Sequence, residues 1–363
     1  MIKYIFVLIL LSFFYIGIAK DSFRAYRSLF KQEVMPLQGE PIVTDSAAFA
    51  RIAQESADFL KKLPKSIYVK ADVGVFEYFG VTLNDVQETL EFIAQTAKKR
   101  PKLLTSPWFY NKYFTFYRWH GDTTKQSTAI PRGWKGAPEH IRVTQYRITE
   151  IYGARHKTKK YHYPLYQLPS DEKLYTSQEK LQHKDSLLRY KYSRSEILNG
   201  ALEGNTLTQP LAWVTEQGRK ELTMQGTALV VFPDKTKMLL QIVGNNGQLK
   251  KEQYWYVKQV AKRPKNSAFP VKVKPKAGVT YAADIKVLGF GKVILLQGWN
   301  VEKERLENRL GVLVDTGEAF TDNLSKIDCF AGYFPDYESF KAHVKEYPHS
   351  ARAYILIKNK TAV

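Results

Sequence analysis

Two aspartates near the C-terminus have the residue type and spacing that could do chemistry. Asp315 follows the apolar run at residues 312–314, and Asp328 follows Ile327 after an intervening loop. Apolar, β-branched runs are typical of buried strands, so each carboxylate would leave the core at a strand end and enter a cleft. Paired carboxylates can act as a general acid and its partner in hydrolytic chemistry. The structural alternative is turn capping, a common role for Asp beside Gly.

The Asp-Thr-Gly triplet that begins at Asp315 also resembles the signature of aspartic proteases. Those enzymes use two carboxylates that share one proton. The chain contains one such triplet, so this hypothesis requires a homodimer. Glu318 also stands where that family keeps a small residue. A dimeric aspartic protease is therefore an alternative hypothesis and not the main one.

Other catalytic and cofactor motifs are missing from the sequence. It contains no Walker loop, no Gly-x-Ser-x-Gly and no paired-cysteine metal site. The segment Gly289-Phe290-Gly291 lacks the third glycine of a dinucleotide-binding motif and lies in a strand-rich context. His156 and His162 are interpreted as surface histidines. We therefore expect neither a metal nor a cofactor.

The composition indicates a basic, folded protein. The 363 residues are enough for two domains, at about 100–200 residues per domain. Lys and Arg number 55 against 35 Asp and Glu, which gives a net charge of +20. Such a charge favours a polyanionic partner, namely nucleic acid, an anionic membrane or an acidic cell-wall polymer. A solvated basic surface without a specific partner is the alternative, because the basic residues are dispersed.

The N-terminus favours the cell envelope among these partners. Lys3 precedes an apolar run at residues 4–19, which Lys20 ends. These features are typical of a secretory signal. The run is shorter than the roughly 20 residues of a spanning helix, but an uncleaved membrane anchor is the alternative. Export argues against nucleic acid as a partner, and the single cysteine, Cys329, cannot form an internal disulfide.

Helices and strands must position the two aspartates. Helical periodicity predicts one helix over residues 46–63 and a second from Thr82, where Thr82-x-x-Asp85 resembles a capping box. From residue 142 to about 297 the pattern is mostly strands and turns, with a hairpin of residues 229–232 and 238–243. Further elements are expected as strands at 292–297, 310–315 and 353–358, an exposed connection at 262–276, and a short helix at 336–347.

Motifs along most of the chain together resemble the membrane-bound lytic murein transglycosylase A (MltA) family. Three of them carry the family's three aspartates, here Asp284, Asp315 and Asp328. The motifs occur in the family's order and at plausible spacing: Tyr163-Pro164-Leu165-Tyr166, Ser193-Arg194-x-Glu196-Ile197, Gly200-Ala201-Leu202, Gln225-Gly226-Thr227, Gly244-x-Asn246-Gly247, Tyr281-Ala282-Ala283-Asp284, Asp315-Thr316-Gly317 and Ile327-Asp328-x-x-x-Gly332.

The resemblance implies a mainly β fold, a double-psi β-barrel with a second, inserted β-domain and a helical N-terminal segment. A groove between the two domains would bind a glycan strand. The expected boundaries are 1–19 for the signal peptide or anchor and 20–150 for the helical segment with the first part of the barrel. Residues 151–249 would form the inserted domain, and 250–363 the barrel with the three-aspartate site.

The resemblance also implies an activity. Asp328 would act as acid and then base in cleaving the β-1,4 bond between N-acetylmuramic acid and N-acetylglucosamine, with a 1,6-anhydromuramoyl product. Asp315 and Asp284 would support it. Tyr146, Thr149, Gln225 and Gly317 are candidates for substrate contacts, with turn or core roles as the alternative. We expect a monomer that binds peptidoglycan glycan strands, exported to the periplasm or anchored facing it in a Gram-negative-type envelope.

The loop between the two aspartates departs from the family pattern. It is longer than the usual loop, and Glu318 and Asp322 stand at glycine-like positions. Two extra acids there could alter the groove or the environment of Asp328. A homologue that binds peptidoglycan without cleaving it is therefore the second alternative.

Overall fold

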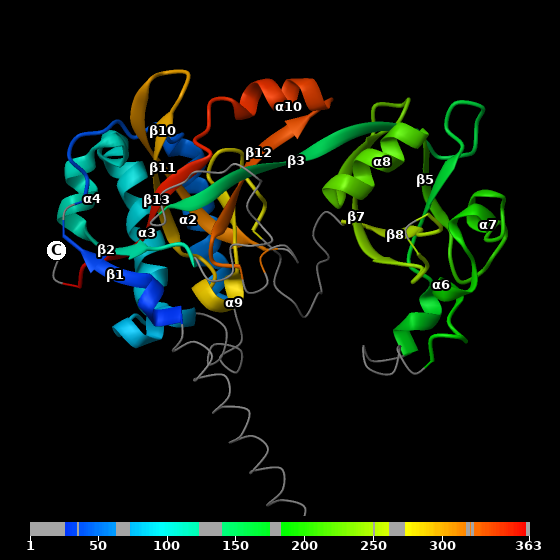
Figure 1. Cartoon of the computed structure of the whole chain (residues 1–363), viewed down its shortest axis with the longest axis horizontal. Helices are drawn as coiled ribbons and strands as arrows, with labels where there is room; N and C mark the ends of the chain where they lie inside the picture. The colour runs from blue at the N-terminus through cyan, green and yellow to red at the C-terminus, as the bar shows by residue number, and fades with distance from the viewer. Residues whose placement is uncertain are drawn as a thin grey trace, which may run out of the picture. The chain divides into compact units, whose positions relative to one another are not determined.

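The computed structural model divides the chain into two compact units (Figure 1). The first unit comprises Met1–Tyr146, Ser267–Gly332 and Ala342–Val363, and the second comprises Arg147–Asn266 and Tyr333–Lys341. The structure describes residues 26–34, 36–62, 73–122, 140–174, 183–249, 251–260, 273–316, 320 and 323–360.

Several sequence predictions lie outside these described residues. They are the N-terminal signal or anchor at residues 1–19, most of the connection at 262–276, and the loop residues Gly317, Glu318 and Asp322. Within the described ranges, no helix combines the length and apolar character needed to cross a membrane.

Two capped helices of the first unit confirm the helical predictions. Helix α2 (Ser46–Lys61) begins after Asp45, whose side chain accepts hydrogen bonds from the next backbone N–H groups at 2.9 and 3.0 Å. Helix α3 (Leu83–Lys99) begins with a complete capping box between Thr82 and Asp85. Such caps satisfy N–H groups that have no partner inside a helix. The apolar faces of both helices are buried in the main hydrophobic core.

Strands of the first unit surround that core. They are β1 (Phe30–Glu33), β2 (Phe114–Trp119), the first part of β3 (Ile141–Ala154), β9 (Thr280–Ala282), β10 (Val293–Asn300), β11 (Arg305–Asp315), β12 (Lys326–Phe334) and β13 (Ser350–Lys358). The predicted strands at 292–297, 310–315 and 353–358 are confirmed as β10, β11 and β13.

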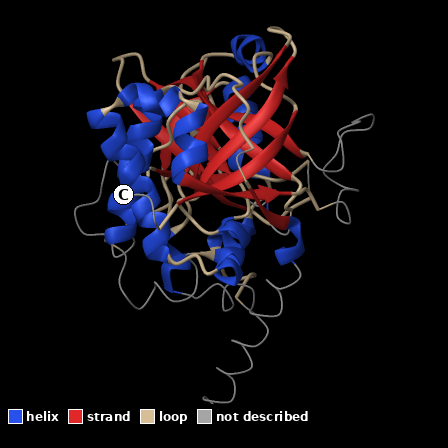
Figure 2. Cartoon of the chain, turned by 90° about the vertical axis from the view of Figure 1, so that its left-hand side faces the viewer, coloured by secondary structure: helices blue, strands red, loops and turns tan. Residues whose placement is uncertain are grey.

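Six of these strands pair in a closed cycle. The order is β13-β10-β11-β9-β12-β3, and β3 returns to β13 through the pairs Ser350↔Arg142 and Ala351↔Ile141. Helix α2 contacts β11 and α3 contacts β13, and helices lie beside the crossing strands in Figure 2. A strand that is covered on both faces typically has a continuous run of apolar residues. Residues 293–296 of β10 form such a run, and all four are buried.

The second unit is a smaller sheet with short helices. It contains the rest of β3, then β4 (Tyr163–Tyr166), β5 (Pro210–Val214), β6 (Thr227–Val231), β7 (Lys237–Asn245) and β8 (Trp255–Gln259). Its helices include α6 (Leu188–Lys191), α7 (Arg194–Leu198) and α8 (Glu216–Gln225). Strands β6 and β7 form the predicted hairpin, with Val230 opposite Met238. The predicted helix at 336–347 is shorter, α10 (Tyr337–Val344).

Candidate active site

The three predicted aspartates lie at neighbouring positions in the first unit. Strand β9 lies between β11 and β12, and its Ala282 pairs with Asp315 on one side and with Asp328 on the other. Adjacent strands are about 4.8 Å apart. Asp284 follows two residues after Ala282, at the end of the same strand. The fold therefore brings together three carboxylates that the sequence separates by loops and strands.

Asp328 is held in a partly buried position on β12. Its side chain is 16% exposed, and the Lys326 Nζ lies 3.1 Å from its Oδ1 atom and donates to its Oδ2 atom at 3.3 Å. Burial raises the pKa of Asp328, and the charge of Asp315 adds to this effect. The charges of Lys326 and Arg142 oppose it, but the net shift is upward. This shift favours the protonated form that a general acid needs.

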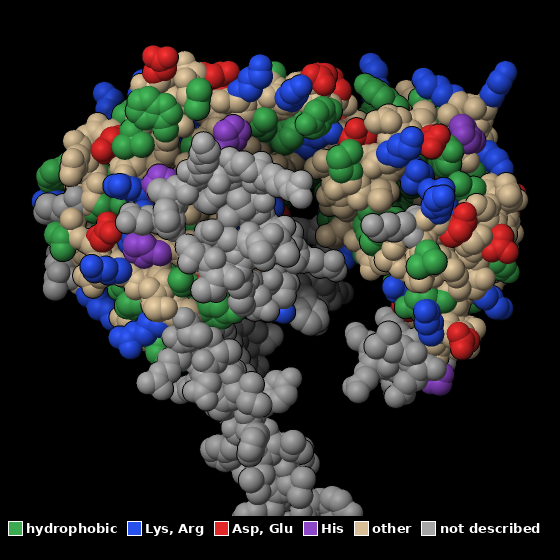
Figure 3. All heavy atoms as spheres, viewed as in Figure 1, with side chains coloured by type: hydrophobic (Ala, Val, Ile, Leu, Met, Phe, Trp, Pro, Cys, Tyr) green, Lys and Arg blue, Asp and Glu red, His purple; other side chains and the backbone are tan. Residues whose placement is uncertain are grey.

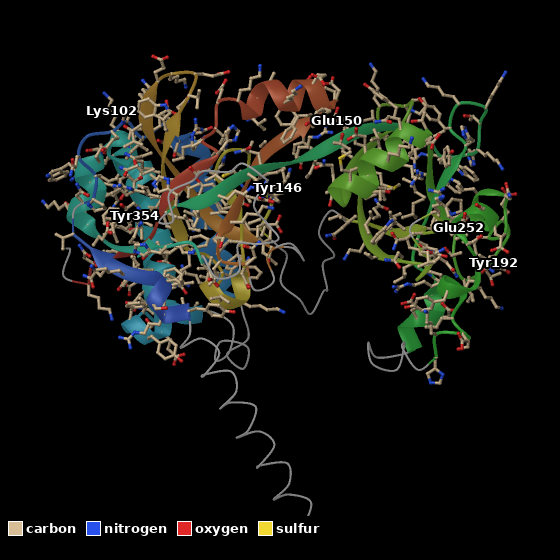
Figure 4. All side chains as sticks on the ribbon, in the orientation of Figure 1. Lys102, Tyr146, Glu150, Tyr192, Glu252 and Tyr354 are labelled. Carbon is tan, nitrogen blue, oxygen red and sulfur yellow. The ribbon has the colours of Figure 1, made fainter. Side chains whose placement is uncertain are left out.

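Asp315 is oriented by two hydrogen bonds. The Tyr146 hydroxyl on β3 donates to its Oδ2 atom at 2.8 Å, and the Thr316 backbone N–H donates to its Oδ1 atom at 2.9 Å. The Tyr146 ring packs against Phe330, with ring centroids 5.2 Å apart. Burial, and then the charge of Asp315, raise the pKa of Tyr146, so the hydroxyl stays protonated and can donate. Figure 4 labels Tyr146 on its strand.

Asp284 has a structural task in addition to its place beside the other two. It is 4% exposed and forms the N-cap of the short helix α9 (Ile285–Leu288). Its Oδ1 atom accepts hydrogen bonds from the backbone N–H groups of Lys286 at 3.0 Å and Val287 at 3.3 Å. A carboxylate in this position also interacts favourably with the helix dipole.

Lys326 and Arg142 are site residues that the sequence reasoning missed. Lys326 stands two residues before Asp328, and residues i and i+2 of a strand face the same side. That spacing was a usable signal. Arg142 carried no such signal, because its place beside β12 depends on a long-range contact, the hydrogen bond from its backbone N–H to the Ser325 carbonyl at 2.8 Å.

Two other predicted substrate contacts lie in the second unit. Thr149 is buried, and its hydroxyl accepts a hydrogen bond from Arg147 at 3.2 Å. The buried Arg147 in turn forms an ion pair with the partly exposed Glu221 at 2.6 Å. Gln225 is the last residue of α8, where Gly226 takes a left-handed conformation and ends the helix. Each residue thus has a local structural role, whereas Gly317 lies outside the described residues.

The surface charge is dispersed on the face shown in Figure 3, and Cys329 is the neighbour of Asp328 in sequence. On the face shown in Figure 3, Lys and Arg side chains are spread among other residue types and not gathered into one patch. The described ranges contain no group of three or more His, Cys, Asp or Glu side chains placed to hold a metal ion. Cys329, next to Asp328, is buried and carries a free thiol.

Comparison with known proteins identifies the insert and the fold. Residues 142–251 match the family of the MltA specific insert domain. No curated protein sequence matches this chain. The structure resembles a membrane-bound lytic murein transglycosylase from Agrobacterium tumefaciens, with a TM-score of 0.57, 16% identity, and coverage of 91% of this chain and 97% of that one.

Two further solved structures share the fold. One is Escherichia coli MltA with bound chitohexaose, at a TM-score of 0.55 and 15% identity, covering 91% of this chain and 94% of that one. The other is the lytic transglycosylase LtgG of Burkholderia pseudomallei. Its TM-score is 0.52 and its sequence identity is 17%, and the match covers 91% of this chain and 98% of that one. The insert domain and the shared fold confirm the resemblance to MltA that the sequence motifs indicated.

Proposed function

We propose that this chain, which carries an MltA-specific insert in an MltA-like fold, is a peptidoglycan lytic transglycosylase. The observation that supports this most is the environment of Asp328. Asp328 is a partly buried carboxyl with a raised pKa. Its strand, β12, pairs with β9, and β9 pairs on its other side with β11 at Asp315. E. coli MltA was solved with chitohexaose, which is consistent with a glycan as the substrate.

The reaction uses one acid that changes its role. Protonated Asp328 donates its proton to the glycosidic oxygen as the bond from C1 of N-acetylmuramic acid breaks, and the N-acetylglucosamine unit leaves with a hydroxyl group. The Asp328 carboxylate then takes the proton of the C6 hydroxyl, whose oxygen attacks C1 and closes the 1,6-anhydro ring. No water is consumed. Asp315, oriented by Tyr146, supplies negative charge near the developing positive charge at C1.

The fold proposal follows from the strand pairing. The closed cycle of six strands in the first unit is the double-psi β-barrel, with α2 and α3 packed on it. The second unit is the inserted β-domain. Thr149, Gln225 and Gly317 are substrate contacts, and Tyr146 acts by positioning Asp315.

The cellular setting is part of the proposal. Residues 1–19 direct export or anchor the chain, and the protein acts as a monomer on the periplasmic side of a Gram-negative-type envelope. Its net charge of +20 suits an anionic polymer such as peptidoglycan. The reaction needs no metal and no cofactor, and nucleic acid is not a partner.

Product mass tests the activity. Purified sacculi are digested with the wild-type chain, and we expect fragments that end in the anhydro ring. Fragments that carry an added water would identify a lysozyme-like hydrolase. Asp328→Asn should abolish release, whereas Glu302→Gln, a change at an exposed hairpin residue, should leave it unchanged. Sacculus binding without any release would instead identify a non-catalytic wall-binding protein, and pepstatin-sensitive peptide cleavage an aspartic protease.

A further inference from the structure

The loop between Asp315 and Asp328 contains a buried aromatic residue that the proposed mechanism does not use. Phe320 is only 4% exposed. In the described part of the chain it does not belong to the main hydrophobic core of the first unit, whereas Leu324, four residues later, does. Buried apolar side chains usually belong to one contiguous core. The burial of Phe320 outside that core therefore points to a contact with a different kind of group.

That group is the ammonium of Lys326, which lies over the face of the Phe320 ring. The Lys326 Nζ atom is 5.1 Å from the ring centroid, within the roughly 6 Å over which an aromatic face attracts a cation. The same Nζ atom is 3.1 Å from the Oδ1 atom of Asp328, and the Lys326 side chain is 17% exposed. Attraction between a cation and a ring strengthens as the cation loses water. One partly desolvated ammonium thus contacts both the ring and the carboxyl.

Hydrogen bonds fix the loop that carries the ring. The Phe320 carbonyl accepts from the Asn323 backbone N–H at 3.0 Å, which closes a turn. The Asn323 side chain accepts from the Ser325 backbone N–H at 3.2 Å. The Ser325 hydroxyl in turn donates to the Asp122 carbonyl at 2.6 Å. The ring is therefore held beside the start of β12, where Lys326 is the first residue.

We propose that Phe320 is a positioning residue, whose ring holds the ammonium of Lys326 against the carboxyl of Asp328. A lysine ammonium ends a flexible four-carbon stem, so without such a contact it would spread over several positions. A cation held beside a carboxyl favours the ionised form. Given the function proposed above, on which this inference rests, Phe320 acts through Lys326 to stabilise the Asp328 carboxylate that takes the proton of the C6 hydroxyl.

The remaining titratable groups near Asp328 are held by strands and not by this loop. They lie on or directly after the strands that carry or flank Asp328: Arg142 and Tyr146 on β3, Asp284 after β9, Asp315 on β11 and Cys329 on β12. Burial is the main cause that raises the pKa of Tyr146 and the pKa of Cys329, so both stay neutral. The charge of Arg142 favours the carboxylate form of Asp328, and the charge of Asp315 opposes it. A change at Phe320 therefore reaches Asp328 through Lys326, the cation that its ring contacts.

Fluorination of the Phe320 ring tests this role with little change in shape. Mono-, di- and trifluorophenylalanine at position 320 progressively weaken the negative face of the ring, which attracts the cation. Each step frees Lys326 further, so the fall of kcat/KM on the basic side of the pH profile should move stepwise to higher pH with soluble glycan strands. Phe320→Leu removes the aromatic face and should move it furthest in this series. Lys326→Met removes the charge itself and should move it further still.

Two controls separate this contact from packing. The same fluorinated series at Phe49, a buried core residue of α2, should leave the pH profile unchanged. In the Lys326→Met background, fluorination at position 320 should have no further effect, because no ammonium remains on the ring. A profile that moves with Phe320→Leu but not with fluorination would overturn the proposal, since apolar packing would then explain the role of Phe320. A shift to lower pH, or an equal shift in the Lys326→Met background, would overturn it as well.

A direct titration of Asp328 separates this inference from the proposed function. The carboxyl carbon signal of Asp328, assigned by its loss in Asp328→Asn, is followed by NMR against pH in the free protein, so that no turnover is required. A titration that moves to higher pH with fluorination, in a protein that releases no fragments from sacculi, would leave the contact standing and remove the lytic activity. Release of anhydro fragments, with a titration that fluorination does not move, would remove the contact and leave the activity.

Discussion

At the scale of single residues, Asp328 is balanced between burial and a cation. Burial favours its protonated form, whereas Lys326, 3.1 Å away, favours its carboxylate. A residue that must first donate and then accept a proton requires both forms to be accessible. Lys326 therefore serves the second half of the proposed reaction, because it stabilises the carboxylate that takes the proton of the C6 hydroxyl.

This balance predicts the basic limb of the pH profile. The pKa of Asp328 is raised, so its protonated form persists to higher pH than that of an ordinary Asp, and activity should fall as pH rises through that pKa. Lys326→Met removes a positive charge that lowers the pKa of Asp328. The fall in activity on the basic side of the pH profile should therefore occur at higher pH. The measurement is kcat/KM against pH with soluble glycan strands. A shift to lower pH would contradict the assignment of this limb to Asp328.

Tyr146 provides a second prediction at this scale. Tyr146→Phe keeps the ring on Phe330 but removes the hydrogen bond to Asp315. A hydrogen bond to a charged group contributes about 1.5–3 kcal/mol, so kcat should fall by roughly 10- to 100-fold if the bond is needed mainly in the transition state. Tyr337→Phe, at an exposed position of α10, is the control. An unchanged kcat for Tyr146→Phe would show that the orientation of Asp315 is not needed.

At the scale of elements, the motifs of the second unit have structural roles. Asn246, from Gly244-x-Asn246-Gly247, is fully buried, and its Nδ2 atom donates to the carbonyls of Tyr192 and Glu252, both at 2.9 Å. Its Oδ1 atom accepts from the Tyr254 N–H at 2.9 Å. This one amide thus joins the turn after β7 to the segments that lead into α7 and β8. Figure 4 labels Tyr192 and Glu252 in this unit.

Asn246→Ala should therefore destabilise the second unit. It leaves two carbonyls and two backbone N–H groups, those of Tyr254 and Gln248, without this partner. Each buried unsatisfied group costs about 1–3 kcal/mol, so a loss of roughly 2–4 kcal/mol is expected after partial rehydration. Urea unfolding followed by tryptophan fluorescence measures it, since Trp213 and Trp255 lie in this unit. Asn199→Ala, at an exposed position after α7, should cost much less. Equal effects of the two changes would refute this role of Asn246.

At the scale of the whole molecule, the dispersed positive charge predicts salt-sensitive binding to the wall. Attraction between a chain of net charge +20 and an anionic polymer is screened over about 10 Å at 0.1 M salt. Sedimentation of the inactive Asp328→Asn variant with sacculi should show affinity falling severalfold between low and physiological salt. Cleavage of short, peptide-free strands should change less. Salt-independent sedimentation would exclude a major contribution from this charge.

Periodic patterns and local motifs predicted most of the elements. Helix α3 follows from an apolar stripe and the capping box of Thr82 and Asp85, and the β6–β7 hairpin follows from two apolar runs around a turn. The strand that ends at Asp315 was predicted from the apolar run that precedes this aspartate. These features depend on neighbours within a few residues, so they are encoded locally.

Contacts between distant segments were not predictable in this way. Tyr146 and Asp315 are 169 residues apart in sequence, yet their side chains share a hydrogen bond. The pairing of β13 with β3, which closes the strand cycle, joins segments more distant still. Both depend on how strands order themselves in the sheet, which no local pattern specifies.

The sequence alone thus predicted most of the elements, the three aspartates and the resemblance to MltA, because propensity, periodicity and motif order are local properties. The tertiary structure decided that Ala282 has Asp315 on one side and Asp328 on the other, and that Lys326 and Arg142 oppose the effect of burial on Asp328. A pKa depends on burial and on charges a few ångströms away, and only the packed chain sets those distances.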